Sequence, residues 1–215
     1  MKSNPQTEKR NFLYDLLRNP SVYDLSQNLL LAYKLRNNKI LENFNFDKKN
    51  KILDIGCGTG NILKILPKKV NYFGFDNNSK CINFAKKKYS NHFFYEGYFD
   101  NKTKETIPNV DLVIMNAVLH HLNDGQIYEL LPIIKSKLDK NGKIICIDPF
   151  YSTDIKNLKD YSKKFRNLIA SFDRGNYVRT KKQYKKILET NFIIDKEIID
   201  YPLLPPMNFI TLICN

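Results

Sequence analysis

The chain has 215 residues, a length that suits one domain with a sizeable buried core. Hydrophobic side chains make up 42% of it, which argues against a disordered protein, and no apolar run approaches the ~20 residues of a membrane-spanning helix. The formal net charge of +13 comes mostly from lysine, with only six arginines, and the lysines are spread along the whole chain. This distribution argues against a nucleic-acid partner, because charge alone gives only non-specific attraction.

The cysteines and the amino-terminal sequence indicate a cytoplasmic protein. Cysteines 57, 81, 146 and 214 form no CxxC pair and are expected to be reduced, mostly buried thiols. The opening sequence MKSNPQTEKRN lacks the apolar core of a signal peptide. Three histidines without paired ligand spacing predict no metal site.

In chain order, apolar periodicity and turn residues predict a helix over 21–46, a strand over 52–55, a helix over about 59–67, a strand over 71–75, a helix over 79–89, strands over 92–96 and 110–115, a helix over about 124–138, a strand over 143–147, helices over about 154–171 and 181–190, and strands over 192–199 and 208–214. Ser79 is expected to cap the helix that it opens. Strands that alternate with helices indicate a parallel sheet covered on both faces. The two late strands are expected to form an antiparallel hairpin at one edge of a single domain.

The loop after the first strand, Gly56–Gly60, has the pattern GxGxG. No Lys-Ser/Thr pair follows it, which excludes a Walker loop, and the third glycine of a dinucleotide fingerprint is replaced by Asn61. Asp54 stands two positions before the loop and would repel a pyrophosphate by roughly 4 kcal/mol at about 4 Å and an effective dielectric near 20. The same carboxylate would attract the ammonium and sulfonium of S-adenosylmethionine, which is therefore the favoured ligand.

A second acid, Asp76, ends the second strand, 22 residues after Asp54. A carboxylate there can accept hydrogen bonds from both ribose hydroxyls, as it does in dinucleotide-binding folds. The alternatives are a solvated turn residue or a helix cap.

Four segments between residues 51 and 149, ILDIGCGTG, FGFD, DLVIMNAVLHHL and GKIICIDP, resemble the class I S-adenosylmethionine-dependent methyltransferases. The resemblance implies a Rossmann-like, doubly wound α/β fold whose seven-stranded sheet has its last strand antiparallel, with N-terminal helices before it. Residues 1–46 would form a helical lid on a methyltransferase domain spanning 47–215. The match places these residues at the cofactor: Asp54, Gly56, Cys57, Gly58, Gly60, Asp76, Asn77, Gly97, Tyr98 and Asn116.

One position departs from the family pattern. Many members carry Gly-Asp after the third strand, where the carboxylate meets the adenine amino group, whereas this chain has Gly97-Tyr98. Tyr98 or Phe99 could stack on the adenine instead.

Methyl transfer needs a base only when the acceptor is protonated, and His120 and His121 follow the fourth strand, where an acceptor would arrive. Asp148 ends the fifth strand at the same rim. These three are the candidate catalytic residues, although one histidine could instead anchor the loop and Asp148 could be a turn residue. The expected acceptor-binding residues are Tyr23, Arg174, Tyr177 and Arg179, with an Asp173–arginine salt bridge as the alternative for the arginine-bearing segment.

The sequence thus predicts an S-adenosylmethionine-dependent O- or N-methyltransferase for a small-molecule acceptor, with S-adenosylhomocysteine as product, in a monomer or homodimer. Two alternatives stay open. One is an RNA or protein methyltransferase, and the other is a non-catalytic partner or regulator that binds the cofactor.

Overall fold

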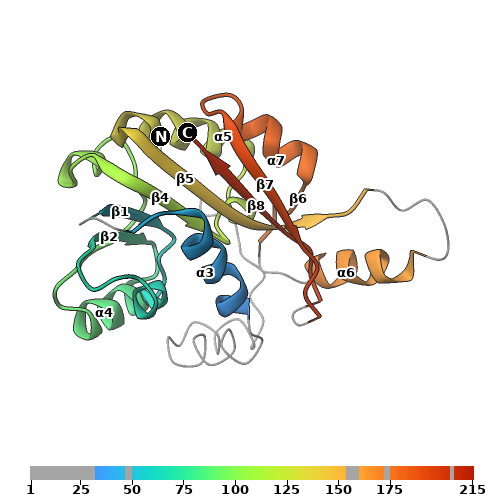
Figure 1. The fold of residues 1–215 in the computed structure, drawn as a ribbon, viewed down its shortest axis with the longest axis horizontal. Coiled ribbons are helices and arrows are strands. Elements are labelled where there is room, and N and C mark those ends of the chain that lie inside the picture. The colour runs from blue at the N-terminus through green and yellow to red at the C-terminus, as the bar shows by residue number, and fades with distance from the viewer. Residues whose placement is uncertain (1–31, 47–49, 154–159, 172–174, 204–205) are drawn as a thin grey trace.

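The computed structural model describes residues 32–46, 50–153, 160–171, 175–203 and 206–215 (Figure 1). Its strands are β1 (Lys51–Ile55), β2 (Asn71–Asp76), β3 (Phe93–Glu96), β4 (Val110–Asn116), β5 (Leu138–Tyr151), β6 (Arg179–Thr180), β7 (Ile194–Asp200) and β8 (Phe209–Cys214). Its α-helices are α3 (Ala32–Asn43), α4 (Ser79–Lys88), α5 (Asp124–Lys137), α6 (Tyr161–Ser171) and α7 (Lys181–Leu188). Short 3-10 helices are η1 (Asn61–Lys64), η2 (Lys104–Thr106) and η3 (Leu119–His121).

The strands form one sheet in the order β3-β2-β1-β4-β5-β8-β7. The five strands from β3 to β5 pair in parallel, and β8 runs antiparallel to both of its neighbours, β5 and β7. This confirms the predicted doubly wound sheet with a reversed last strand. The two-residue strand β6, which the sequence did not predict, pairs with the end of β5 beside the main path.

Helices cover both faces of the sheet, as Figure 1 shows. On one face, Leu53 of β1 belongs to a buried cluster that includes Ile127 of α5. On the other face, Ile52 packs in a cluster with Ile40 of α3 and Ile82 of α4. Each such fully buried side chain contributes about 1.5–3 kcal/mol, so alternation along the strands holds the helices on both sides.

Several predicted boundaries were wrong for local reasons. The helix expected over 59–67 is only the single turn η1. The cap of α4 is Asn78, whose side-chain oxygen accepts from the N–H groups of Lys80 and Cys81, and Ser79 is the first helical residue. Strand β5 begins at Leu138, before the expected start, because Leu138 already pairs with Val110 of β4. Residues 139–142 then bulge out before Lys143 pairs with Leu112. The part of the first helix expected over 21–31 lies outside the described residues.

Candidate active site

A pocket of about 250 Å³ opens at the carboxyl-terminal ends of β1, β2 and β4, the edge where ligands bind in open α/β sheets. Residues of α3 and of the first turn of α4 border it. All of the residues that the sequence placed at the cofactor line this pocket, with the exception of Gly60.

The glycine loop forms the floor between β1 and β2. The N–H groups of Gly56 and Cys57 both donate to the Phe75 carbonyl, at 2.8 and 3.0 Å, which pins the loop to the end of β2. Gly56 has φ 75°, and a Cβ there would lie 2.6 Å from Val118 Cγ2. Gly58 has φ 53°, and a Cβ there would meet no atom within 4 Å. Glycine is therefore required at both positions, and at Gly58 the bare backbone faces open pocket.

Asp54 is a buried carboxylate, 4% exposed, at the wall of the pocket. Its Oδ2 accepts a 2.5 Å hydrogen bond from the Tyr72 hydroxyl. Burial raises the pKa of Asp54 to about 7, the hydrogen bond from Tyr72 opposes that rise, and the negative charge of Asp76 adds to it. A buried acid with such a pKa has a strong preference for a cationic partner.

Asp76, at the end of β2, is oriented by two backbone donors. Gly58 N–H donates to its Oδ2 and Asn78 N–H to its Oδ1, both at 2.8 Å. Burial raises the pKa of Asp76, and these two hydrogen bonds partly offset the rise. Each carboxylate oxygen has a further lone pair, so the group can still accept two hydroxyl hydrogens from a ligand.

Residues after β2 and β3 form the outer part of the pocket. The Asn77 side-chain amide donates to the Tyr98 hydroxyl at 3.3 Å, and Tyr98 is 62% exposed. Phe99 is buried, 4% exposed, and also lines the pocket. The two aromatic residues offered by the sequence for adenine stacking are thus both at the pocket.

Helix α3 supplies a buried polar pair that the sequence analysis missed. Arg36 and Asn37 are 7% and 6% exposed and line the pocket beside Tyr33. The Arg36 guanidinium lies 5.7 Å from the Tyr33 ring centre and 5.5 Å from that of Phe209. The Asn116 side-chain amide donates to Asn37 Oδ1 at 3.1 Å, which joins α3 to the end of β4. The signal in the sequence was an arginine and an asparagine on the inner, apolar face of an amphipathic helix.

The loop after β4 carries the two histidines. His120 is 2% exposed, and its Nδ1 lies 2.6 Å from Oδ1 of Asp148, which is equally buried. Asp148 also accepts from the N–H groups of His120 and Leu119, at 3.2 and 3.3 Å. His121 lines the pocket, and its ring centre is 4.1 Å from that of His120. The three candidate catalytic residues therefore form one cluster, with His121 at the pocket and the other two behind it.

Residues 18–192 match the family model of the O-methyltransferase domain. The chain belongs to this O-methyltransferase family. The match covers more than half of the chain and agrees with the predicted methyltransferase class.

Curated relatives of this chain include two proteins named as O-methyltransferases. Desmethylxanthohumol 6'-O-methyltransferase of Humulus lupulus is 26% identical over 73% of this chain, and O-methyltransferase 4 of Dictyostelium discoideum is 26% identical over 92% of it. The chain spans 44% and 59% of the lengths of these two proteins, and 25% of scoulerine-9-O-methyltransferase 3 of Papaver somniferum.

Solved structures share the fold. The pyocyanin biosynthetic protein PhzM aligns with a TM-score of 0.69 at 15% identity, over 95% of this chain and 61% of its own. Human N-acetylserotonin methyltransferase, solved in complex with S-adenosylmethionine, aligns with a TM-score of 0.64 at 19% identity, over 97% of this chain and 60% of its own.

Arg179 of this O-methyltransferase domain does not face the pocket, contrary to the sequence-based expectation. It is 5% exposed, its Nε and Nη2 donate to Asp124 Oδ1, and its remaining bonds reach the carbonyls of Leu119, Leu122 and Tyr177. Since these groups fill its donor fork, Arg179 clamps the histidine loop to β6 instead of binding an acceptor.

The other expected acceptor residues are placed only in part. Tyr177 lies beside the histidine loop, where its N–H donates to the His120 carbonyl at 2.9 Å. Tyr23 and Arg174 lie outside the described residues.

Among the described residues, no group of three or more His, Cys, Asp or Glu side chains could hold a metal ion. In the same part of the chain, no helix is long and apolar enough to cross a membrane.

Proposed function

We propose that this protein is an S-adenosylmethionine-dependent O-methyltransferase that modifies a hydroxyl group of a small molecule. The observation that carries the proposal is the pocket itself, in which a glycine loop lies between the buried carboxylate of Asp54 and the half-buried carboxylate of Asp76. The family match and the two relatives named as O-methyltransferases support oxygen as the methylated atom.

The charges of the pocket fit the cofactor. S-adenosylmethionine carries an ammonium, a sulfonium and one carboxylate, and the pocket presents two carboxylates and the buried guanidinium of Arg36. We assign Asp54 to the ammonium, Arg36 to the carboxylate and the free lone pairs of Asp76 to the ribose hydroxyls. Tyr98 or Phe99 would stack on the adenine, and a bound phosphate would be repelled by both acids.

When bound, the cofactor supplies an electrophilic methyl group on a sulfonium. The chain then has to align an acceptor oxygen, exclude water and remove the hydroxyl proton. We assign the proton to Nε2 of His120, because Asp148 holds Nδ1–H and would stabilise the imidazolium that forms. Gly175 packs against the Cδ2 edge of that ring.

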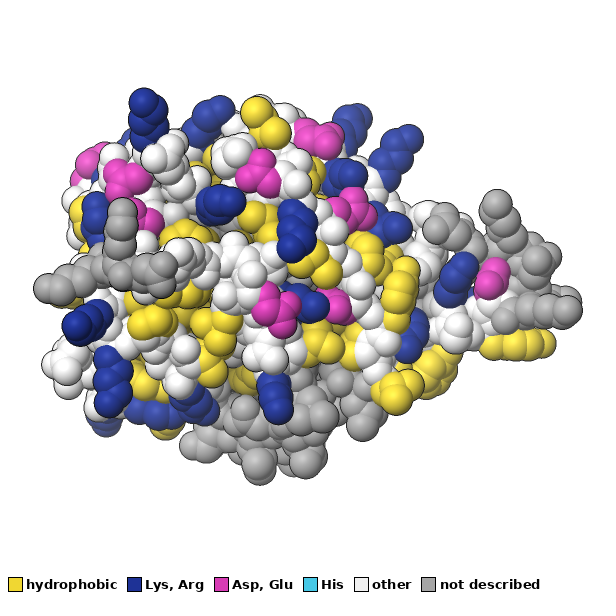
Figure 2. Space-filling view, in the orientation of Figure 1, with side chains coloured by type: hydrophobic (Ala, Val, Ile, Leu, Met, Phe, Trp, Pro, Cys, Tyr) yellow, Lys and Arg dark blue, Asp and Glu magenta, His cyan; other side chains and the backbone are white. Residues whose placement is uncertain are grey.

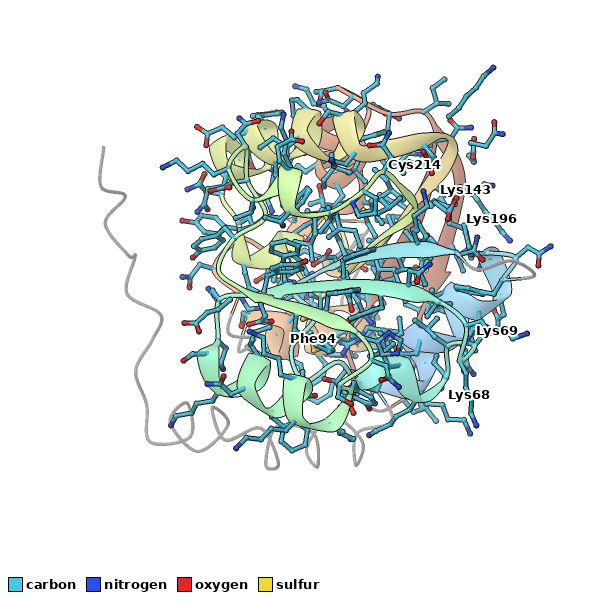
Figure 3. The ribbon with its side chains drawn as sticks, turned by 90° about the vertical axis from the view of Figure 1, so that its left-hand side faces the viewer. Lys68, Lys69, Phe94, Lys143, Lys196 and Cys214 are labelled. Carbon is cyan, nitrogen blue, oxygen red and sulfur yellow. The ribbon has the colours of Figure 1, made fainter. Side chains whose placement is uncertain are left out.

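A small molecule is favoured over nucleic acid by the surface charges. Lysine and arginine side chains are scattered between acidic ones on the face in Figure 2. Lys68, Lys69, Lys143 and Lys196, labelled in Figure 3, lie along one edge, at the amino-terminal side of the strands and away from the pocket. Lys143 is 3.9 Å from Asp195, and Lys196 donates to Asn43, so part of this charge is already engaged. We further propose a cytoplasmic enzyme, which the four free, buried cysteines support.

The proposal is tested with S-adenosylmethionine carrying a radiolabelled methyl group and a panel of small phenols and alcohols. We expect label in a small-molecule product with the wild type and none with Asp54→Ala. His120→Ala should lower kcat about 10²- to 10⁴-fold, whereas His121→Ala should mainly raise KM for the acceptor. Label found in RNA or protein, or cofactor binding without transfer to any panel member, would contradict the proposed acceptor class.

A further inference from the structure

The carboxylate of Asp54 has an unusual neighbour. Within the described part of the chain, the one hydrogen bond that the structure gives to this carboxylate comes from the Tyr72 hydroxyl of β2, at 2.5 Å. Both groups are shielded from water, with Tyr72 0% and Asp54 4% exposed. Asp76, the other acid of the pocket, is held by backbone N–H groups instead.

The register of the two strands explains how the tyrosine reaches the acid. β1 and β2 pair in parallel with Ile52 opposite Tyr72 and Asp54 opposite Gly74. Residues two apart on a strand project from the same face, so Tyr72 points to the face that carries Asp54. A Cβ at Gly74 would lie 2.9 Å from Tyr72 Cε1, which means that the ring occupies the space left by the missing side chain. Gly74 is thus the gap through which the hydroxyl reaches the carboxylate.

Aromatic neighbours fix the position of the ring. The Tyr72 ring centre lies 5.6 Å from that of Phe94, which projects from β3 on this side of the sheet (Figure 3). The His92 ring stands edge-on to it at 5.9 Å and 71°. A ring held on two sides has little rotamer freedom, so its hydroxyl is aimed permanently at Asp54.

We propose that Tyr72 is a positioning residue of the cofactor site, whose hydroxyl binds Oδ2 of Asp54 and keeps this carboxylate ionised, which leaves Oδ1 for the cofactor ammonium. This inference rests on the proposed function. It makes a residue at the buried start of β2, remote from the glycine loop in sequence, a determinant of the pH range in which the cofactor binds.

The charged and polar groups around Asp54 determine in which direction its pKa changes when the Tyr72 hydroxyl is removed. Burial and the charge of Asp76 raise the pKa of Asp54 to about 7, while the hydrogen bond from Tyr72 lowers it. The other groups that face this site are the Arg36 guanidinium, the Cys57 thiol and His92. Burial raises the pKa of Cys57 well above its usual value, so the thiol stays neutral, and burial lowers the pKa of His92. Removing the Tyr72 hydroxyl therefore moves the pKa of Asp54 further up.

The test is calorimetric titration of S-adenosylhomocysteine into wild type and Tyr72→Phe between about pH 6 and pH 9. If the pKa of Asp54 rises by one, Tyr72→Phe binds about tenfold more weakly at pH 6, about fivefold more weakly at pH 7, and as tightly as wild type near pH 9. The ratio of the two dissociation constants is the readout, because titration of the ligand's own amino group cancels from it. Tyr184→Phe, which removes another buried phenol hydroxyl beyond the opposite face of the sheet, should show a ratio near one at every pH.

A second pair of variants keeps the test decisive if Tyr72→Phe is less stable. In an Asp54→Asn background, where no carboxylate remains to ionise, Tyr72→Phe should change the affinity by less than about twofold at any pH. A loss that is equal at all pH values, or that persists in the Asp54→Asn background, would overturn the inference and leave Tyr72 a packing residue. If wild type itself does not bind S-adenosylhomocysteine, the proposed function fails and the inference fails with it.

Discussion

Gly74→Ala is the substitution whose cost the structure defines most closely. An added Cβ would lie 2.8 Å from Cys57 Sγ, 2.9 Å from Tyr72 Cε1 and 3.0 Å from Phe94 Cδ1. All three side chains are buried, at 9%, 0% and 4% exposure, so none can swing into solvent. Overpacking of this kind costs about 1–3 kcal/mol, and the lower entropy of the unfolded alanine chain returns about 0.4–1 kcal/mol.

We therefore expect Gly74→Ala to lower the free energy of unfolding by about 1–2 kcal/mol, measured from the urea midpoint at an unchanged slope. Because the clash includes the Tyr72 ring, affinity for S-adenosylhomocysteine should fall as well. Gly125→Ala, the same chemical change at an exposed position in the first turn of α5, is the matched control and should stay within about 0.5 kcal/mol of wild type. A Gly74→Ala protein as stable as this control would refute the packing argument.

Three further predictions concern the site and its supports. Arg179→Lys should lower the free energy of unfolding by about 2–3 kcal/mol in urea, because an ammonium cannot bond Asp124 and three carbonyls at once; an unchanged midpoint would contradict the clamp. Asp54 holds its proton up to a pKa of about 7 when folded but only to 3.8 when unfolded, so its ionisation destabilises the apo fold as pH rises through this window. The melting temperature of Asp54→Asn should thus exceed that of wild type by a margin that grows from pH 5 to pH 8. A margin that stays constant would show that Asp54 does not titrate in this range. Asp148→Asn should lower kcat about 10- to 100-fold without changing the affinity for S-adenosylhomocysteine, and weaker cofactor binding would place Asp148 elsewhere in the mechanism.

The sheet and the glycine loop could be predicted from sequence because their signals are local. Continuous apolar runs such as 110–115 mark strands buried on both faces, and the segment from Asp54 to Gly60 carries its chemistry within seven consecutive residues. The acid at the end of β2 followed from the spacing of the two strands. The antiparallel pairing of the last two strands followed from their closeness in the chain.

The rest depends on contacts between distant residues. Arg179 resembles an acceptor ligand in sequence, yet its partners at Leu119, Leu122 and Asp124 lie more than 50 positions away, and only the fold brings them together. Arg36 stands out in the sequence only as an arginine on the apolar face of a helix, and its place at the pocket depends on how α3 packs on the sheet. The Tyr72–Asp54 pair needs both the register of β1 with β2 and the empty space at Gly74, neither of which a single sequence encodes locally.

The measurement that tests the central claim most directly is calorimetric titration of S-adenosylhomocysteine at pH 8 into wild type, Asp76→Ala and Tyr184→Phe. We predict micromolar binding by the wild type, the same affinity for Tyr184→Phe, and a loss of at least tenfold for Asp76→Ala, whose carboxylate would hold the ribose. Absence of binding by a folded wild type, or binding that is indifferent to Asp76, would contradict the assignment of this pocket to S-adenosylmethionine.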